Sequence, residues 1–193
     1  MDDLIKRIET KFTILDKKHQ RDDLVFLTME KSHVVDVLTC LRDTEGFRHL
    51  VMISAVDHIE YDVFQLTYLV HSYQQHVDLG ICINVDRNNP VMDSIHHLWA
   101  GAQVYQREIK EMFGIDFPES PRVDEPMILE GWDNIPPLRR DFDTKKYAEE
   151  TFFPREGRKT HDPRKVMEEQ SYPHESKVKY EIKRLVRGNR NHS

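Results

Sequence analysis

Three neighbouring segments in the first half of the chain place the strongest constraint on its fold. Residues 50–56 form an apolar, β-branched run, and residues 63–71 and 77–85 carry apolar side chains at every second position. A period of two is that of a β-strand with one buried face. Because the links 59–62 and 72–76 are short enough for hairpins, we expect a meander of three antiparallel strands, each half exposed.

A short helix and two more strands are predicted before this meander. Apolar residues at positions 4, 5 and 8 mark an N-terminal helix. Residues 12–14 and 24–29 predict two strands, and the charged residues 16–23 between them are expected to form a turn.

Two longer helices complete the pattern. In residues 33–42 the apolar positions recur at i, i+3, i+4 and i+7, with Ser32 as the expected N-cap and Gly46 as the stop. A second apolar stripe predicts a helix over residues 101–113, ended by Gly114. The order α-β-β-α-β-β-β-α predicts an α+β fold. It is a two-layer sandwich of helices on a mixed, largely antiparallel sheet, followed by an extended Pro-rich segment and a C-terminal tail.

The composition excludes several classes of protein. The 193 residues carry 28 Lys and Arg against 34 Asp and Glu, whereas a nucleic-acid binder is usually basic. The longest apolar stretch is far shorter than the ~20 residues of a membrane-spanning helix, and the acidic N-terminus lacks a signal-peptide core. Cys40 and Cys82 are too few for a four-thiolate site and are expected to be buried thiols in a reducing cytoplasm. Glycine-rich nucleotide-binding loops are absent.

Charge is distributed unevenly along the chain. Residues 1–153 hold 17 Lys and Arg against 28 Asp and Glu, whereas residues 154–193 hold 11 against 6. A basic tail of this kind is expected to rest on an acidic partner. Its apolar residues at positions 178, 182, 185 and 186 form one helical stripe, which predicts a docking helix; binding to anionic lipid is the alternative.

Residues 116–144 form an unusual segment. They hold five of the nine prolines, which disfavour helices and central strands, together with eight large apolar residues. Because a segment this long without secondary structure is uncommon unless it binds something, we expect it to wrap around a partner. The chain is therefore predicted to comprise an α/β domain over residues 1–115, this Pro-rich segment over residues 116–144, and a charged C-terminal arm over residues 145–193.

Few residues suggest a reaction. His96, His97 and Glu108 would form the site of a free-standing metal-dependent enzyme, which is one alternative. Adjacent helical residues point about 100° apart, however, so the histidine pair is poorly placed to share one ion. His58 and Glu60, at a predicted hairpin, are a weaker candidate for metal or acid–base chemistry. No serine or cysteine nucleophile motif is present. A further alternative to an enzyme is an independent adaptor protein.

Charged residues of the second long helix have a structural interpretation. Arg107 and Glu111, at i and i+4, are expected to pair on the helix surface. Glu108 borders the apolar stripe and would need partners, for which Arg139 and Arg140 are the candidates.

Two motifs are recognisable. The first runs from Trp99 to Phe117 (WAGAQVYQREIKEMFGIDF), and the second runs from Pro137 to Phe142 (PLRRDF). In this order they resemble the 30 kDa subunit family of respiratory complex I, which is also called the family of the NADH-quinone oxidoreductase C subunit. The resemblance covers about residues 1–145.

The chain departs from the family's pattern in two places. Gln106 stands where the family usually has the first glutamate of E-R-E, and the usual G-H-P and L-R-R are absent from residues 119–132. In these respects the chain is more similar to the homologous subunit of membrane-bound, complex I-related NiFe hydrogenases and sulfur-reducing complexes. The alternative is the corresponding C subunit of a true NADH- or F420H2-quinone-type oxidoreductase.

The resemblance implies a non-catalytic scaffold subunit in the peripheral arm of a membrane-bound, ion-translocating redox complex. It would lie on the cytoplasmic face of the cell membrane, without a transmembrane segment, and contact the membrane through other subunits. The expected partners are the large 49 kDa or hydrogenase-like subunit, the small iron–sulfur subunit and a ferredoxin-like subunit. No cofactor is expected in this chain, because the iron–sulfur clusters and a NiFe site would belong to the partners.

Packing and interface roles, rather than catalytic, cofactor or metal roles, are therefore expected for thirteen residues. A charged hydrogen-bonded network at the border of the core is expected for five of them, Arg107, Glu108, Arg139, Arg140 and Asp141. The others are Trp99, Tyr105, Phe113, Phe117, Trp132, Pro137, Leu138 and Phe142.

Overall fold

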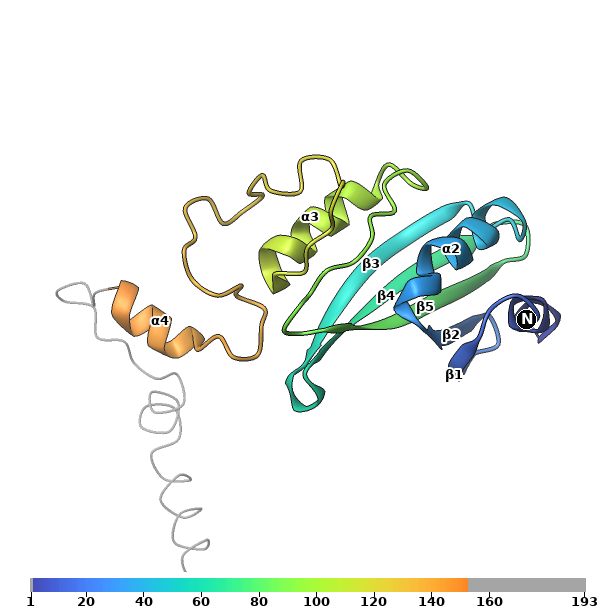
Figure 1. The fold of residues 1–193 in the computed structure, drawn as a ribbon, viewed down its shortest axis with the longest axis horizontal. Helices are drawn as coiled ribbons and strands as arrows, with labels where there is room; N and C mark the ends of the chain where they lie inside the picture. The colour runs from blue at the N-terminus through green and yellow to red at the C-terminus, as the bar shows by residue number, and fades with distance from the viewer. Residues whose placement is uncertain (1, 153–193) are drawn as a thin grey trace, which may run out of the picture. The chain divides into compact units, whose positions relative to one another are not determined.

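The computed structural model describes residues 2–152, which contain a five-stranded sheet with α2 and α3 on the same side of it (Figure 1). Its spatial order is β1-β2-β5-β4-β3. β2 and β5 run parallel, and the other neighbouring pairs run antiparallel, so the predicted mixed sheet and its three-stranded meander are confirmed. The strands are β1 (Ile14–Arg21), β2 (Leu24–Met29), β3 (His49–His58), β4 (Val63–Ser72) and β5 (Val77–Asp86).

The helices of the described residues are α1 (Asp2–Glu9), α2 (Val34–Asp43), α3 (Ala102–Phe113) and α4 (Thr144–Thr151). Short 3-10 turns span Lys31–His33 and Ile59–Tyr61. The chain divides into two units, residues 1–144 and residues 145–193. No helix within residues 2–152 is long and apolar enough to cross a membrane. The apolar stripe predicted between positions 178 and 186 lies outside the described residues.

One face of the sheet carries the core. Leu27, Ile81 and Tyr68 stand side by side on neighbouring strands, and each is fully buried. β4 alternates strictly between half-buried and buried side chains, as its sequence predicts. Burying a Leu or Ile side chain contributes about 1.5–3 kcal/mol. Apolar residues of three helices join this core: Leu4, Ile5 and Ile8 from α1; Val34, Val37, Leu38 and Leu41 from α2; Ala102 and Ile109 from α3.

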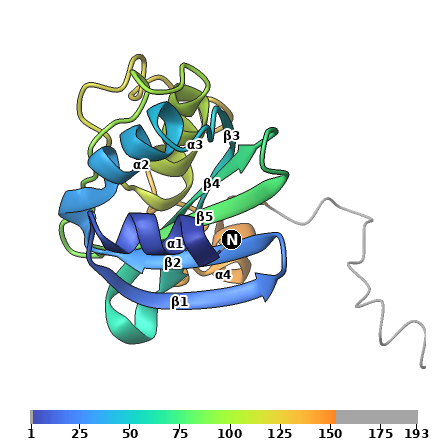
Figure 2. The same cartoon turned by 90° about the vertical axis from the view of Figure 1, so that its right-hand side faces the viewer.

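The first strand is longer than the sequence predicted. Residues 16–21, predicted to be part of a charged turn, belong to β1, and only Asp22 and Asp23 form the turn to β2 (Figure 2). β1 lies at the edge of the sheet, and its residues after Ile14 are all exposed, so no apolar period marks it. Charged side chains on an edge strand also hinder pairing with other chains.

The helix ends agree with the predictions only in part. Ser32 does not cap α2, because it lies in the 3-10 turn before the helix, and α2 begins without a side-chain cap. Gly46 and Gly114 do follow their helices, each with φ of 79°, a left-handed conformation that favours glycine. The N–H of Gly114 donates to the carbonyl oxygen of Lys110 at 2.9 Å, which closes α3.

The Pro-rich segment follows α3 without regular structure. Residues 117–143 contain turns and bends but no helix or strand, as predicted. Asp116 forms a single parallel bridge with Val91 at its start. The segment then passes beside α3 before it reaches α4 (Figure 1). Its path depends on the side-chain contacts that hold it.

Candidate functional site

The end of β3 holds a buried carboxylate that the sequence reasoning missed. Asp57 is only 4% exposed. Its Oδ1 accepts a hydrogen bond from Arg87 Nε at 3.0 Å, and its Oδ2 accepts the backbone N–H of Arg140 at 2.8 Å. Leaving a buried carboxylate without partners is costly, and these bonds satisfy the oxygens of Asp57 in the core. The signal available in the sequence is an Asp at a core-facing strand position, opposite Phe64.

Ion pairs around this carboxylate fasten the PLRRDF motif. Asp141 Oδ1 lies 2.8 Å from Arg87 Nη2 and 3.3 Å from Arg139 Nε, and Arg140 Nη1 lies 2.6 Å from Glu60 Oε2. Partial burial raises the pKa of Asp141, but the two guanidinium groups outweigh it and hold that pKa below its usual range. The hydrogen bond from Arg140 likewise lowers the pKa of Glu60. We call Asp57, Glu60, Arg87, Arg139, Arg140 and Asp141 the arginine anchor.

An aromatic pair supports the arginine anchor. The guanidinium carbons of Arg87 and Arg139 lie 5.8 and 5.5 Å from the centre of the Phe64 ring. Phe113, at the end of α3, meets the same ring edge-on with 6.2 Å between centroids. A cation–π contact contributes about 0.5–2 kcal/mol, more when it is desolvated. These contacts hold the motif against both the sheet and α3.

A second set of contacts fixes the middle of the Pro-rich segment on α3. Arg107 Nε and Nη2 donate to the carbonyl oxygens of residues 125 and 126, both at 2.6 Å. Glu111 Oε1 accepts the three consecutive N–H groups of residues 127–129 at 2.8–3.1 Å. Partial burial raises the pKa of Glu111. The hydrogen bonds from these N–H groups lower it by more, so the pKa of Glu111 lies below its usual range. We call Arg107, Glu111 and residues 125–129 the loop clamp.

The predicted surface pair of Arg107 with Glu111 is therefore wrong, because both side chains bind the loop backbone instead. Glu108 is exposed on α3, and Arg139 and Arg140 have other partners, so their predicted pairing is also wrong. An exposed carboxylate is solvated by water and needs no ion pair. The expected charged network is divided between the arginine anchor and the loop clamp, and Glu108 belongs to neither.

Gln106 is the fully buried polar residue of α3. Its Oε1 accepts hydrogen bonds from the hydroxyl groups of Ser94 and Ser120, both at 2.8 Å. Its Nε2 and the Tyr68 hydroxyl have no hydrogen-bond partner within the described residues. Burial raises the pKa of Tyr68, and the charge of Asp93 adds to that shift. Gln106, the residue at which the first motif departs from the family pattern, thus lies in the core.

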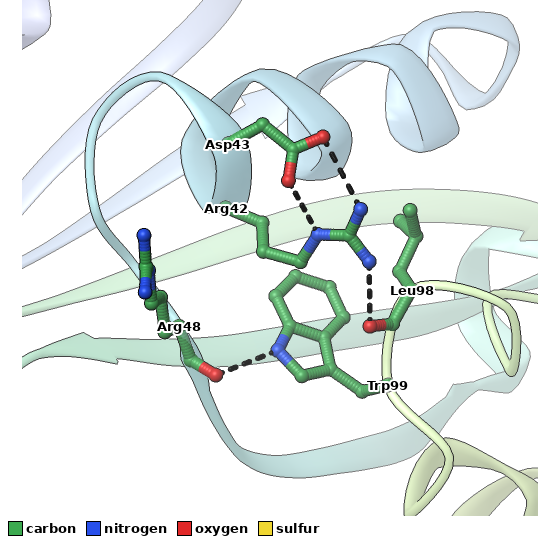
Figure 3. Close-up of a pocket in the computed structure, with 5 residues that line it drawn as sticks. All are labelled: Arg42, Asp43, Arg48, Leu98 and Trp99. Carbon is green, nitrogen blue, oxygen red and sulfur yellow. Dashed lines mark hydrogen bonds and ion pairs between the residues drawn. The ribbon is translucent and has the colours of Figure 1, made fainter.

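A shallow pocket lies between the end of α2 and the chain before α3 (Figure 3). Arg42 is bonded to the carboxylate of Asp43 and to the carbonyl oxygen of Leu98, each at 2.7 Å. Trp99 Nε1 donates to the carbonyl oxygen of Arg48 at 2.9 Å (Figure 3). The polar groups of Arg42 and Trp99 that line the pocket are thus already hydrogen-bonded within the chain.

The remaining aromatic residues of the first motif pack to different degrees. Phe117 is fully buried, whereas Trp99, Tyr105 and Phe113 are half-buried against the core. The Tyr105 hydroxyl donates to the carbonyl oxygen of Val51, at the bulge of β3, at 2.9 Å. These residues fasten α3 and its flanks to the sheet.

The second motif and Trp132, which precedes it, combine packed and exposed residues. Trp132 and Phe142 are half-buried, with their rings 5.5 Å apart. Pro137 is half-buried, and Leu138 is 54% exposed although its N–H donates to the carbonyl oxygen of Met112 at 3.0 Å. The backbone at Leu138 is thus fixed while its side chain faces outward.

Residues 2–152 contain no group of three or more His, Cys, Asp or Glu side chains that could hold a metal ion, as a metal-dependent enzyme would require. His96, His97 and Glu108 do not form such a group, so that prediction is wrong. Glu60, the other candidate, is bound to Arg140. The charged side chains of the arginine anchor and the loop clamp instead hold the backbone of the Pro-rich segment in place.

The two cysteines differ in their surroundings. Cys82 is buried as predicted, and burial raises the pKa of its thiol. Cys40 is only half-buried, with Lys11 Nζ 3.4 Å from its sulfur, which corrects the prediction of a buried thiol. Cys40 lies on α2 but outside its buried stripe of Val34, Val37, Leu38 and Leu41, which accounts for the difference.

Comparison with known proteins places these features in a family. The sequence model of the family described as "Respiratory-chain NADH dehydrogenase, 30 Kd subunit" matches residues 27–148. The chain is 29% identical over 142 residues to the C subunit of the NADH-quinone oxidoreductase of Moorella thermoacetica, a match that covers 74% of this chain and 95% of the relative. It is 28% identical over 120 residues to the C subunit of the F(420)H(2) dehydrogenase of Methanosarcina mazei, a match that covers 60% and 73%.

A solved structure shares the fold. A chain of the membrane-bound sulfane sulfur reductase, an archaeal respiratory membrane complex, matches with a TM-score of 0.75. The match covers 83% of this chain and 96% of that chain, at 19% sequence identity. At that identity the likeness shows the fold.

Proposed function

Because the chain belongs to the respiratory-chain NADH dehydrogenase 30 kDa subunit family, we propose that it is a non-catalytic scaffold subunit in the peripheral arm of a membrane-bound, ion-translocating redox complex. Family membership makes it a subunit of a complex I-related complex, with other subunits as partners. Its own contribution is to fix the geometry of a partner.

The single observation that carries this proposal is the apolar surface of the Pro-rich segment. Two sets of hydrogen bonds and ion pairs, the arginine anchor and the loop clamp, hold its backbone in place. The same segment nevertheless exposes large hydrophobic side chains, which the chain's own residues cover only in part. They are Met127 (37% exposed), Ile128 (72%), Ile135 (39%) and Leu138 (54%).

The proposed partner of this surface is the large 49 kDa or hydrogenase-like subunit. A small iron–sulfur subunit and a ferredoxin-like subunit complete the proposed surroundings, on the cytoplasmic face of the membrane. The iron–sulfur clusters, and a NiFe site where one exists, belong to those partners, and this chain contributes no ligand to them.

Within the family, the proposed branch is that of the hydrogenase-type and sulfur-reducing complexes. Gln106 and the altered residues 119–132 support it. A second candidate is the corresponding C subunit of an NADH- or F420H2-quinone-type oxidoreductase. The names of the relatives from Moorella thermoacetica and Methanosarcina mazei favour that candidate.

The test is affinity purification of the tagged chain from detergent-solubilised membranes of its own host, with mass spectrometry of the bound chains. A hydrogenase-like large subunit together with iron–sulfur subunits supports the proposal. A module that oxidises NADH or F420H2 decides for the second candidate. A chain that elutes alone contradicts both.

A further inference from the structure

Ile128 is the most exposed aliphatic side chain of the described residues, with 72% of its surface open to solvent. It lies at the middle of the loop clamp, between Met127 and Leu129. An aliphatic side chain in that position contributes little to the chain's own core. Its exposure is nevertheless a fixed feature of the structure, because the backbone on both sides of it is bound.

The loop clamp determines that position. Glu111 accepts the N–H groups of three consecutive residues, and Arg107 donates to the two preceding carbonyl groups. Gly131, with φ of 74°, turns the chain just after the clamp. A loop ordered before binding does not lose its backbone entropy on association, which is how preorganised binding segments gain affinity.

The charges around Ile128 indicate what kind of partner surface it would bind. Asp124 is paired with Lys110, which also pairs with Asp116, and Glu125 is paired with Arg122. By contrast, Glu130 and Asp133 are exposed and form no ion pair within residues 2–152, and no Lys or Arg lies between positions 123 and 138. An apolar centre with an acidic border fits a pocket whose border is basic.

Exposed apolar surface continues onto α3. Val104 is 50% exposed and lies three and seven positions before the two clamp residues, on the same side of the helix. Met127, at 37% exposed, lies next to Ile128 in the loop. Ile128 is therefore the most exposed member of a small apolar group.

From these observations, and resting on the proposed function, we propose that Ile128 is the anchoring residue of the subunit interface. It inserts into an apolar pocket, bordered by Lys or Arg, on another protein subunit of the complex. Residues of this kind, fixed in place and fully desolvated on binding, dominate interface energies.

The experiment compares two substitutions in the full chain, expressed in its own host and purified with its complex. Ile128→Asp is expected to lower the amount of co-purified partner by about tenfold or more. Leu15→Asp is the matched control, since Leu15 is also an exposed aliphatic residue (56%) but lies on β1. It is expected to leave co-purification unchanged.

A photo-crosslinking amino acid at position 128 identifies the pocket. Crosslinks to a segment of a partner subunit that combines apolar residues with Lys or Arg support the inference. Crosslinks to a second copy of this chain, or none to a co-purifying subunit, overturn it. If the wild-type chain recovers its complex and Ile128→Asp recovers it equally, the inference fails while the proposed function stands. If the wild-type chain recovers no partner, the proposed function fails.

Discussion

Arg140 and Asp57 lie 83 residues apart in the sequence, yet the backbone N–H of Arg140 donates to Asp57 Oδ2 at 2.8 Å. The bond uses the main chain of the motif, so it fixes the path of the Pro-rich segment independently of the side chain at position 140. The guanidinium of Arg140 is then left to pair with Glu60 near the surface. One buried carboxylate at the end of β3 thus determines where the segment passes the sheet.

Replacing Asp57 is expected to destabilise the protein strongly. Asp57→Ala leaves the guanidinium of Arg87, whose side chain is 12% exposed, with Asp141 as its remaining ion-pair partner, and it removes the acceptor of the Arg140 N–H. Breaking a buried ion pair in this way costs about 3–5 kcal/mol of the free energy of unfolding, measured by urea denaturation of the full chain. Asp22→Ala, in the exposed turn between β1 and β2, is the control and should change it by less than about 0.5 kcal/mol. Equal effects of the two substitutions would contradict the role given to Asp57.

Arg140→Ala is expected to reduce assembly of the complex while leaving the stability of the chain unchanged. Both Arg140 and Glu60 are more than half exposed, so their pair adds little to folding, and the backbone bond to Asp57 persists. We therefore expect an unchanged urea midpoint, less assembled complex after affinity purification, and an unchanged redox spectrum of whatever complex assembles. Normal assembly with lost turnover would instead indicate a direct catalytic role.

The loop clamp is expected to depend on pH. The pKa of Glu111 lies below its usual value of 4.5, so the carboxylate stabilises the loop above that value, and this contribution is lost as the pH falls through the lowered pKa. Hydrogen-exchange protection factors of residues 127–129 should stay constant from neutral pH down to that value and fall below it.

Two variants check the assignment of this effect to Glu111. Glu111→Gln should show lower protection of residues 127–129 at neutral pH, without the fall in acid, because it carries no titrating group. Glu108→Gln, three positions earlier and exposed, should behave as the wild type. A fall in acid that survives in Glu111→Gln would assign the effect to another group.

Gly114→Ala is expected to disturb both α3 and the second motif. At φ of 79° an Ala side chain is strained, and its Cβ would lie 3.1 Å from Pro136 Cγ. We expect a loss of about 1–2 kcal/mol in the free energy of unfolding. Gly101→Ala, at the other end of α3 with no atom near its Cβ, should be neutral or slightly stabilising. A loss of the same size at both positions would exclude the contact with Pro136 as the cause.

Local patterns predicted part of this structure correctly. The alternation in residues 63–71 and 77–85 identified β4 and β5, and the glycine at position 114 marked the end of α3. β1 escaped the pattern because an edge strand with exposed sides has no apolar period. The two motifs identified the family, since short linked sequences need no three-dimensional information to be matched.

By itself, therefore, the sequence determined the α+β class, the core strands and the family, because periodicity and motifs are properties of neighbouring residues. Only the tertiary structure decided which charges meet. Arg107 and Glu111 have the spacing of a surface pair, yet both bind the loop, whose backbone offers several well-placed groups to each side chain. Asp57 and Arg140 meet because the sheet brings together the ends of segments far apart in the chain. Such contacts depend on distances that only folding creates, so they cannot be predicted from the spacing of residues along the chain.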